Sequence, residues 1–343
     1  MAVGLLEVRG TIDVSQFWPT GRSDADTTKV VVQITEDAFK FRTHPGAPAR
    51  TTTFWQGAKV KGSIGLKPPI DNKNRLTIRL QGIDAPELHY QSSPLTSVER
   101  KASSEKALAQ YKALNHFYRQ PFGATSTNAL RNLLMKSSRQ IIPCRVWTHV
   151  DHPSEIFDTY GRFVGDIDVT LRGQALDINY WLIKQGWAFP AFYSSMSADE
   201  IITITGLAKT ARSKKLGIWK YLAKTIDAFD FNLLEPATGD TRVLAKDKGP
   251  VLYPKLFRRQ CSWALRKKAG ISKLTLQQYL EARTDACFKT SEFLAQSIHS
   301  AKTYPFASFV KAGKTVGFEP DGLVFQEAPS KLLGVDGKEV VNF

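Results

Sequence analysis

The sequence predicts an α+β fold, in which strands and helices form separate runs of the chain. Stretches rich in β-branched residues, or alternating between apolar and polar residues, recur along the first half and favour strands. Longer stretches with apolar residues at helical spacing follow the predicted strands that begin at Leu76 and at Phe163. At 343 residues the chain can bury a sizeable core, as one large domain or two moderate ones.

The predicted elements follow in chain order. The third strand begins at Leu76 and ends at the turn Asp84-Ala85-Pro86, where Pro86 favours an extended Ala85. Gly186 is expected to close the third helix. The other predicted strands cover 5–14, 29–35, 141–149 and 163–169, and the predicted helices cover roughly 97–118, 127–136, 177–185 and 207–215.

Two further regions interrupt or follow this pattern. The proline-containing segment 36–74 reads as an insertion, with short strand-like pieces at 39–42 and 59–62. The composition shifts near residue 224, and we predict a C-terminal α+β extension over 224–343 whose role the sequence leaves open. Within it, an apolar stripe predicts one helix over 275–300, and Asp321-Gly322 predicts the turn of a hairpin over 315–325.

The charge of the chain favours a polyanionic partner. With 47 Lys and Arg against 32 Asp and Glu, the formal net charge is +15, which suits nucleic acid or an acidic membrane surface. No apolar run approaches the roughly 20 residues of a membrane span, and residues 1–7 lack the features of a signal peptide. We therefore expect a soluble cytoplasmic protein with no membrane partner, unless a signal-independent route exports it. No stable protein partner is evident.

Cysteine and histidine give no metal or disulfide pattern. Cys144, Cys261 and Cys287 lie far apart and form no CxxC pair, and the six histidines are scattered. Neither a disulfide framework nor a zinc site is expected.

Charged side chains converge around the third strand. Arg79, Asp84 and Glu87 lie within nine residues at its end, a pattern that suits a phosphate site with a metal. A phosphodiester gains negative charge in its reaction, so we assign Arg79 and Arg162 as two clamps on its oxygens. Asp26 and Asp84 offer hard oxygen ligands for a cation such as calcium. Each motif alone also suits an ordinary turn, because Asp and Gly favour turns.

Taken in order, these motifs strongly resemble the active-site pattern of the thermonuclease family typified by staphylococcal nuclease. The pattern comprises Asp26, Arg79-x4-Asp84-x2-Glu87 and Asp158-x-Tyr160-Gly161-Arg162, and it continues through 179–188 and Leu216-Gly-Ile-Trp219. The resemblance covers about residues 5–222, with interruptions at 36–74 and 88–140, and predicts a nuclease domain over 1–223. It implies a five-stranded OB-type barrel with packed helices.

The resemblance also implies roles and an activity. Ala85 would give a backbone carbonyl to calcium, and Glu87 would hold or activate the attacking water. The implied activity is hydrolysis of DNA and RNA with little sequence preference, leaving 3′-phosphate ends. Tyr160, Phe192 and Tyr193 are candidates for stacking on bases, although packing in the core is an equal alternative for Phe192. Thr159 stands where the family often has a lysine.

Other functions remain open at this level. The fold also serves as a catalytically silent nucleic-acid-binding or scaffold module, although here all the carboxylates are present. A nuclease acting as a toxin or defence effector is a third reading. The helical stretch 253–268 has two basic clusters, Arg258-Arg259 and Arg266-Lys267-Lys268, that could grip a nucleic-acid backbone or lie on a solvated face.

Overall fold

The core of the protein is a closed five-stranded barrel. The computed structural model describes residues 3–16, 23–35, 37–62, 65–225, 235–236, 250–296, 300–311, 315–327 and 330–343. Strand β1 (Leu5–Asp13) pairs with β2 (Thr27–Val32), β2 with β7 (Arg75–Leu80), β7 with β11 (Phe163–Leu171), β11 with β10 (Ile141–His149) and β10 with β1. Only the β7–β11 pair is parallel. The predicted five-stranded OB-type α+β fold is confirmed.

Alternation along the strands explains the barrel. Leu76, Ile78 and Leu80 of β7 are buried, whereas the residues between them are partly exposed. Side chains of a strand alternate between its two faces, so one face fills the barrel while the other remains free for polar residues. Arg79 belongs to this second face, directly opposite Thr27 of β2.

Further strands extend the barrel sheet or belong to a separate sheet. Residues 36–74 contain β3 (Phe39–Arg42), β4 (Arg50–Thr51), β5 (Lys59–Gly62) and β6 (Gly65–Lys67), which confirms the two predicted strand-like pieces. Of these, β3 and β4 extend the barrel sheet, whereas β5 and β6 belong to a separate sheet. β3 pairs with the first half of β1, beside the stretch of β1 that pairs with β2. β12 (Gln174–Asp177) continues β11 as a hairpin.

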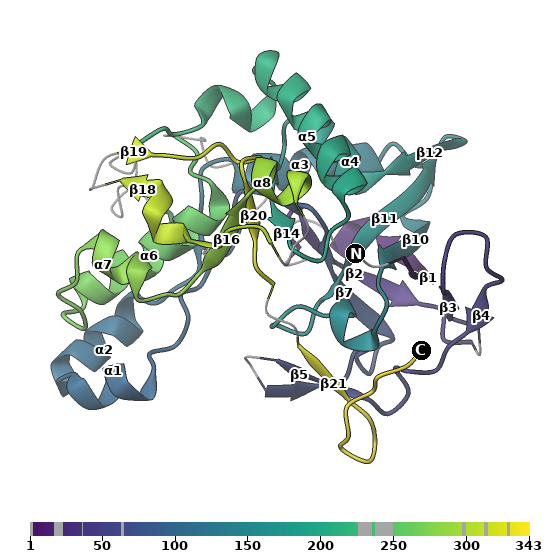
Figure 1. Cartoon of the computed structure of the whole chain (residues 1–343), viewed down its shortest axis with the longest axis horizontal. Helices are drawn as coiled ribbons and strands as arrows, with labels where there is room; N and C mark the ends of the chain where they lie inside the picture. Colours follow the sequence, from purple (N-terminus) through teal and green to yellow (C-terminus); the bar gives the residue numbers. More distant parts are fainter. Residues whose placement is uncertain are drawn as a thin grey trace.

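Helices α3 (Gly123–Leu134), α4 (Ile178–Lys184) and α5 (Ala198–Ser213) pack on the barrel, α4 and α5 side by side above it in Figure 1. Gly186, at φ +72°, closes α4 as predicted. The helix predicted over 97–118 is instead α1 (Ser97–Ala102) and α2 (Glu105–Leu114), because Ser104 starts a new helix by accepting a hydrogen bond from the Ala107 amide. α5 begins earlier than predicted, at the capping box of Ser197 and Glu200.

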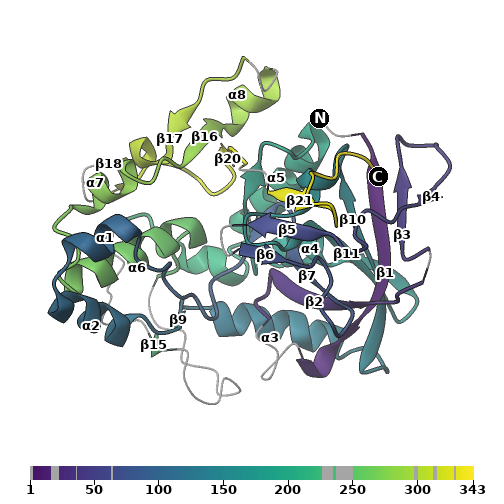
Figure 2. The ribbon, with the colours of Figure 1, turned by 90° about the horizontal axis from the view of Figure 1, so that it is seen from below.

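The C-terminal part of the chain packs against both sides of the barrel domain (Figures 1 and 2). Helix α6 (Pro254–Lys268) contacts α2, and β20 (Leu323–Phe325) pairs with β14 (Phe192–Tyr193). β21 (Lys331–Leu333) pairs with β5, and the ring of Phe343 stacks on Phe41 of β3. One hydrophobic core therefore runs through both parts. The division near residue 223 stays a prediction.

Two predictions for this C-terminal part are wrong. Residues 275–300 form α7 (Leu276–Glu281), β16 (Ala286–Lys289) and α8 (Thr290–Ala295) rather than one helix, with 297–299 outside the described residues. The expected hairpin over 315–325 does not form: β19 (Thr315–Val316) pairs with β18 (Val310–Lys311), whereas β20 pairs with β14 and β16. Pairing with distant strands overrides the local turn signal.

The remaining short strands also form pairs. β8 (Ile83–Asp84) pairs with β13 (Phe189–Pro190), β9 (Tyr118–Arg119) with β15 (Glu235–Pro236), and β16 with β17 (Tyr304–Pro305). All three cysteines are buried and free. None of the helices in the described part of the chain has the length and apolar character that a membrane crossing needs.

Candidate active site

Asp26, Arg79 and Asp84 lie together at one end of the barrel. Arg79 Nη1 contacts Asp26 Oδ1, and Arg79 Nη2 lies 2.6 Å from Asp84 Oδ1, so one guanidinium joins the two carboxylates. Asp26 and Asp84 are buried, with 3% and 1% of their surface exposed. The sequence-predicted convergence of these three residues is therefore present in the structure.

The backbone around Asp84 fixes this arrangement. Gly82 turns the chain after β7 at φ +73°, and the following β8 pairs with β13, which places Asp84 opposite Phe189. The amide of Ala85 donates to Asp26 Oδ2 at 2.6 Å, and the Leu80 amide donates to the Asp26 carbonyl at 2.8 Å. Asp26 is thus bonded through both its main chain and its side chain to the segment that carries Asp84.

Arg162 joins the same network through a short turn. Asp158 Oδ1 accepts hydrogen bonds from the amides of Tyr160 and Arg162 at 2.9 Å, and Gly161 turns the chain at φ +76°. The Arg162 side chain donates to Asp158 Oδ2 at 2.7 Å and to the Thr27 hydroxyl at 3.2 Å. That hydroxyl donates to Asp26 Oδ1, so Thr27 links Arg162 to the two carboxylates.

The match with a known family fits this geometry. Residues 77–221 match the model of a family described as staphylococcal nuclease homologue. This part of the chain is similar to staphylococcal nuclease homologues. The matched range includes Arg79, Asp84, Glu87 and Arg162, and Asp26 lies before it. No curated protein matches the chain. Similarity to this family over residues 77–221 indicates nuclease activity or nucleic-acid binding.

Glu87 reaches the candidate site from the loop after β8. Its amide donates to the Gln120 side chain at 3.1 Å, and Gln120 in turn donates to the Leu252 carbonyl at 2.6 Å. Burial raises the pKa of Glu87 to about 7, although neighbouring Arg258 favours its charged form. A carboxyl group with such a pKa suits proton exchange near neutral pH.

The pKa values of the two aspartates are shifted in opposite directions. Burial disfavours the charged form of Asp84, but Arg258 and Arg79 outweigh this and lower its pKa to about 2. The pKa of Asp26 is raised, first by burial and further by the charge of Asp84, against the opposing effect of Arg79. Asp84 is therefore the more firmly ionised of the two.

Sequence analysis did not place Arg258 in the site. This residue of α6 donates to Asp84 Oδ1 at 3.1 Å and to Asp84 Oδ2 at 2.8 Å, and it also contacts Glu87 Oε1. Nothing in the sequence separates it from Arg259, which instead bonds Asp285. The contact joins residues 174 positions apart, so only the tertiary fold reveals it.

The three candidate stacking residues lie in different environments. Tyr160 has 54% of its surface exposed, and the Arg162 guanidinium lies over its ring. Phe192 is fully buried where β14 pairs with β20, so the expected stacking role does not suit it. Tyr193 is partly buried near Arg79 and Asp84. Burial is the main cause of the raised pKa of its hydroxyl; the charge of Asp84 raises this pKa further and that of Arg79 lowers it.

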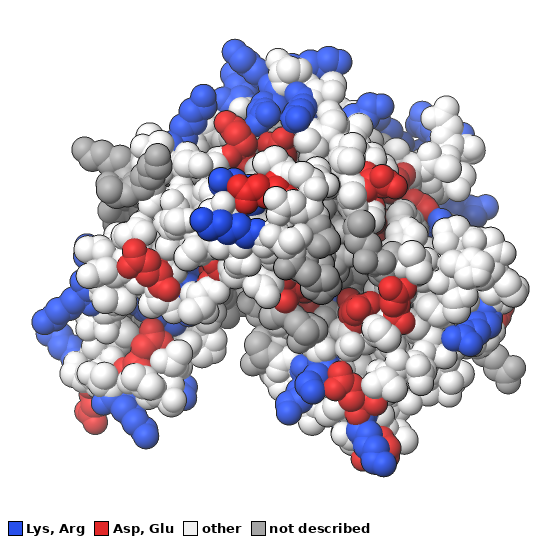
Figure 3. Space-filling model, viewed as in Figure 1, with Lys and Arg blue, Asp and Glu red and all other residues white. Residues whose placement is uncertain are grey.

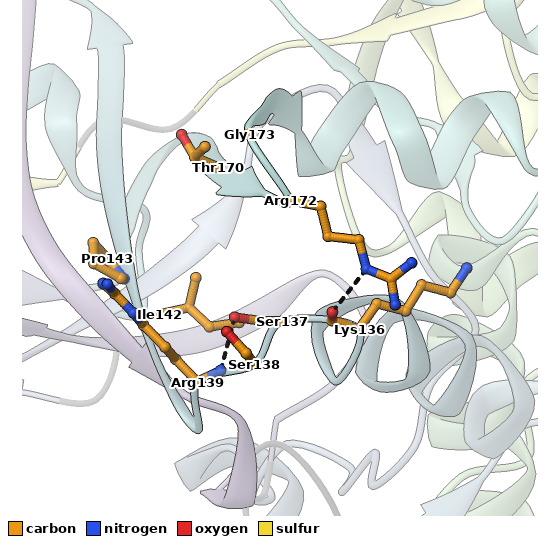
Figure 4. Close-up of a pocket in the computed structure, with 9 residues that line it drawn as sticks. All are labelled: Lys136, Ser137, Ser138, Arg139, Ile142, Pro143, Thr170, Arg172 and Gly173. Atoms are coloured by element: carbon orange, nitrogen blue, oxygen red, sulfur yellow. Dashed lines mark hydrogen bonds between the residues drawn. The ribbon is translucent and has the colours of Figure 1, made fainter.

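The surface offers a pocket elsewhere on the domain (Figure 4). Thr170, which lines it, lies near the end of β11 opposite Arg162. The pocket has a volume of about 660 Å³, and its lining includes Lys136, Arg139 and Arg172. Nine residues of extended chain, at about 3.3 Å each, span roughly 30 Å. The pocket is therefore separate from the candidate site. Lys and Arg also stand along the upper edge of the molecule in Figure 3.

Proposed function

We propose that the chain is a calcium-dependent phosphodiesterase that cleaves DNA and RNA with little sequence preference and leaves 3′-phosphate ends. The observation that carries this proposal is the single network that joins Arg162, Asp26, Arg79, Asp84 and Glu87. Together with Arg258, which links Glu87 to Asp84, these residues come from four separate stretches of the chain. A fold has little reason to collect so many buried charges at one end of a barrel unless they act on a charged ligand.

The residues present suit a hard cation. Asp26 and Asp84 would hold it together with the carbonyl of Ala85; Arg79 joins the two carboxylates, and the Ala85 amide bonds Asp26. In the described residues no three His, Cys, Asp or Glu side chains gather as a metal site, so water and phosphate oxygens would supply the remaining ligands. A bound divalent cation would stabilise negative charge on the phosphate oxygens.

The protein groups divide the remaining work. The planar guanidinium groups of Arg79 and Arg162 would bind phosphate oxygens and stabilise the charge that develops on them. Glu87 would accept a proton from the attacking water or orient it. Contacts to phosphate and stacking on bases do not read the 2′-hydroxyl, which supports activity on both DNA and RNA.

One observation favours a second candidate, a module that binds nucleic acid without cleaving it. Both oxygens of Asp84 and one of Glu87 are bonded to Arg258, so protein groups already satisfy the carboxylates. A site filled in this way could serve binding alone. A simple assay distinguishes the two candidates, because only the first cleaves the nucleic acid.

The test is incubation of the protein with single-stranded DNA, duplex DNA and RNA, in calcium or in a chelator. We expect cleavage of all three in calcium, new ends that carry 3′-phosphate, and no cleavage in the chelator. Cleavage that persists in the chelator would contradict the calcium dependence. Binding without cleavage would favour the second candidate.

A further inference from the structure

Arg258 brings a third guanidinium group into the candidate site. It comes from α6, outside the range that matches the nuclease family. Its two terminal nitrogens bond both oxygens of Asp84, and one of them also contacts Glu87. The Arg258 group therefore occupies both oxygens through which Asp84 would bind a metal ion. It also holds Glu87, the carboxylate proposed to act on the attacking water.

The body of α6 is firmly fixed. Arg259 makes two bonds of 2.7 Å to Asp285, and Arg266 bonds Glu99 at 2.7 Å. Tyr90 donates to the carbonyl of Arg258 itself at 3.1 Å. Leu256, Phe257 and Leu265 are buried in the core. Because the helix is anchored on both sides of Arg258, only the flexible side chain of that residue is free to change partners.

The balance of charge in the site determines when the Arg258 side chain would change partners. The guanidinium group of Arg162 is paired with Asp158. This leaves the three carboxylates of Asp26, Asp84 and Glu87 against the two guanidinium groups of Arg79 and Arg258. A divalent cation added to this set would leave positive charge in excess. A phosphodiester brings one negative charge and restores the balance, and its oxygens suit the fork of an arginine as well as a carboxylate does.

We propose that Arg258 is a third phosphate-binding residue, which in the absence of nucleic acid occupies Asp84, a carboxylate that a divalent cation requires, together with Glu87. The cation and the nucleic acid then bind together, because the phosphate draws Arg258 from Asp84 and Glu87 as the cation takes its place. This inference rests on the proposed function and assigns to the C-terminal part of the chain a role in the site.

The test is a calorimetric calcium titration of the parent protein, Arg258→Ala and Arg258→Gln, each with and without a phosphorothioate-linked oligothymidylate. Without the oligonucleotide, we expect both variants to bind calcium at least tenfold more tightly than the parent. With it, the affinity of the parent should rise at least tenfold and that of the variants much less. Lys267→Ala, exposed on the same helix and not one of its anchoring residues, is the matched control and should titrate like the parent.

Equal calcium affinity in the parent and in folded Arg258 variants would overturn the proposal. So would an affinity of the parent that the oligonucleotide leaves unchanged. Thermal unfolding monitored by circular dichroism shows which variants are folded, and Gln keeps hydrogen-bonding capacity if Ala disturbs the site. The titration needs no turnover, so an absence of cleavage would defeat the proposed function while this comparison stays readable.

Discussion

Glu87 is the residue through which the proposed chemistry is most directly tested. Its side chain is 14% exposed and lies against Arg258, while its amide is held by Gln120. Replacement of the carboxylate by an amide keeps the shape and the hydrogen-bonding oxygen but removes the base. We predict that Glu87→Gln binds a single-stranded oligonucleotide within about threefold of the parent but cleaves it about 10²–10⁴-fold more slowly.

Fluorescence anisotropy and a single-turnover cleavage assay on the same preparation measure the two effects. A variant that loses binding in proportion to cleavage would show that Glu87 serves structure rather than chemistry. The comparison needs no assumption about whether Glu87 removes a proton or orients the water.

The residues of the site differ in how far the sequence could predict them. Asp158 and Arg162 lie within one turn of five residues, whose hydrogen bonds are local, and Arg79, Asp84 and Glu87 follow one another along one strand and loop. Such local spacing is visible in the sequence. Arg258 was not predictable, because its place depends on how α6 packs. The sequence left core packing and stacking as equal alternatives for Phe192, because its burial depends on a strand from the C-terminal part.

At the scale of elements, strand β11 carries a buried carboxyl group. Asp166 accepts a hydrogen bond from Asn179 of α4, and burial, followed by the charges of Asp177 and Glu200, raises its pKa well above the usual value. A raised pKa contributes stability that is fully present below the unfolded value of about 3.9 and is lost as the pH rises through the folded value.

Asp166→Asn cannot ionise, so it escapes this loss. We predict that the stability of the variant relative to the parent increases between pH 5 and pH 7, by up to about 1.4 kcal/mol per pH unit. Urea denaturation at the two pH values measures the difference. A difference that does not change with pH would mean that Asp166 is ionised in the folded protein.

Helix α6 is held to the loop before α1 by Arg266. This side chain is 1% exposed, bonds Glu99 at 2.7 Å and Ser92 at 3.0 Å, and also donates to the carbonyls of Ser93 and Pro94. Removal of one partner from a buried ion pair leaves the other groups without their donor. We predict that Arg266→Ala lowers the free energy of unfolding by about 3–5 kcal/mol.

Chemical denaturation checks this value. Lys267→Ala, one position further along α6 and exposed, is the control and should change stability by no more than about 0.5 kcal/mol. A loss as small as that of the control would show that Glu99 and the loop are well solvated without Arg266.

For the whole molecule, the barrel was predictable because apolar and polar residues alternate along its strands, and each strand is long enough for this pattern to be recognised. The C-terminal part was not, since β16, β20 and β21 are strands of three or four residues that take their partners from distant segments. Short strands carry little local signal and are decided by tertiary packing. The same packing delivers Arg258, so the part of the fold that the sequence left open also changes the site.

The central claim is that this network acts on a phosphodiester, and Arg79 stands at its centre between Asp26 and Asp84. The most direct test is the single-turnover rate of cleavage of single-stranded DNA in calcium by the parent, Arg79→Ala and Arg145→Ala. Arg145 bonds Glu7 and Asp168 on the barrel surface and serves as the control. We predict a loss of at least about 10³-fold for Arg79→Ala and a rate within about threefold of the parent for Arg145→Ala. Equal rates for all three proteins would contradict the account.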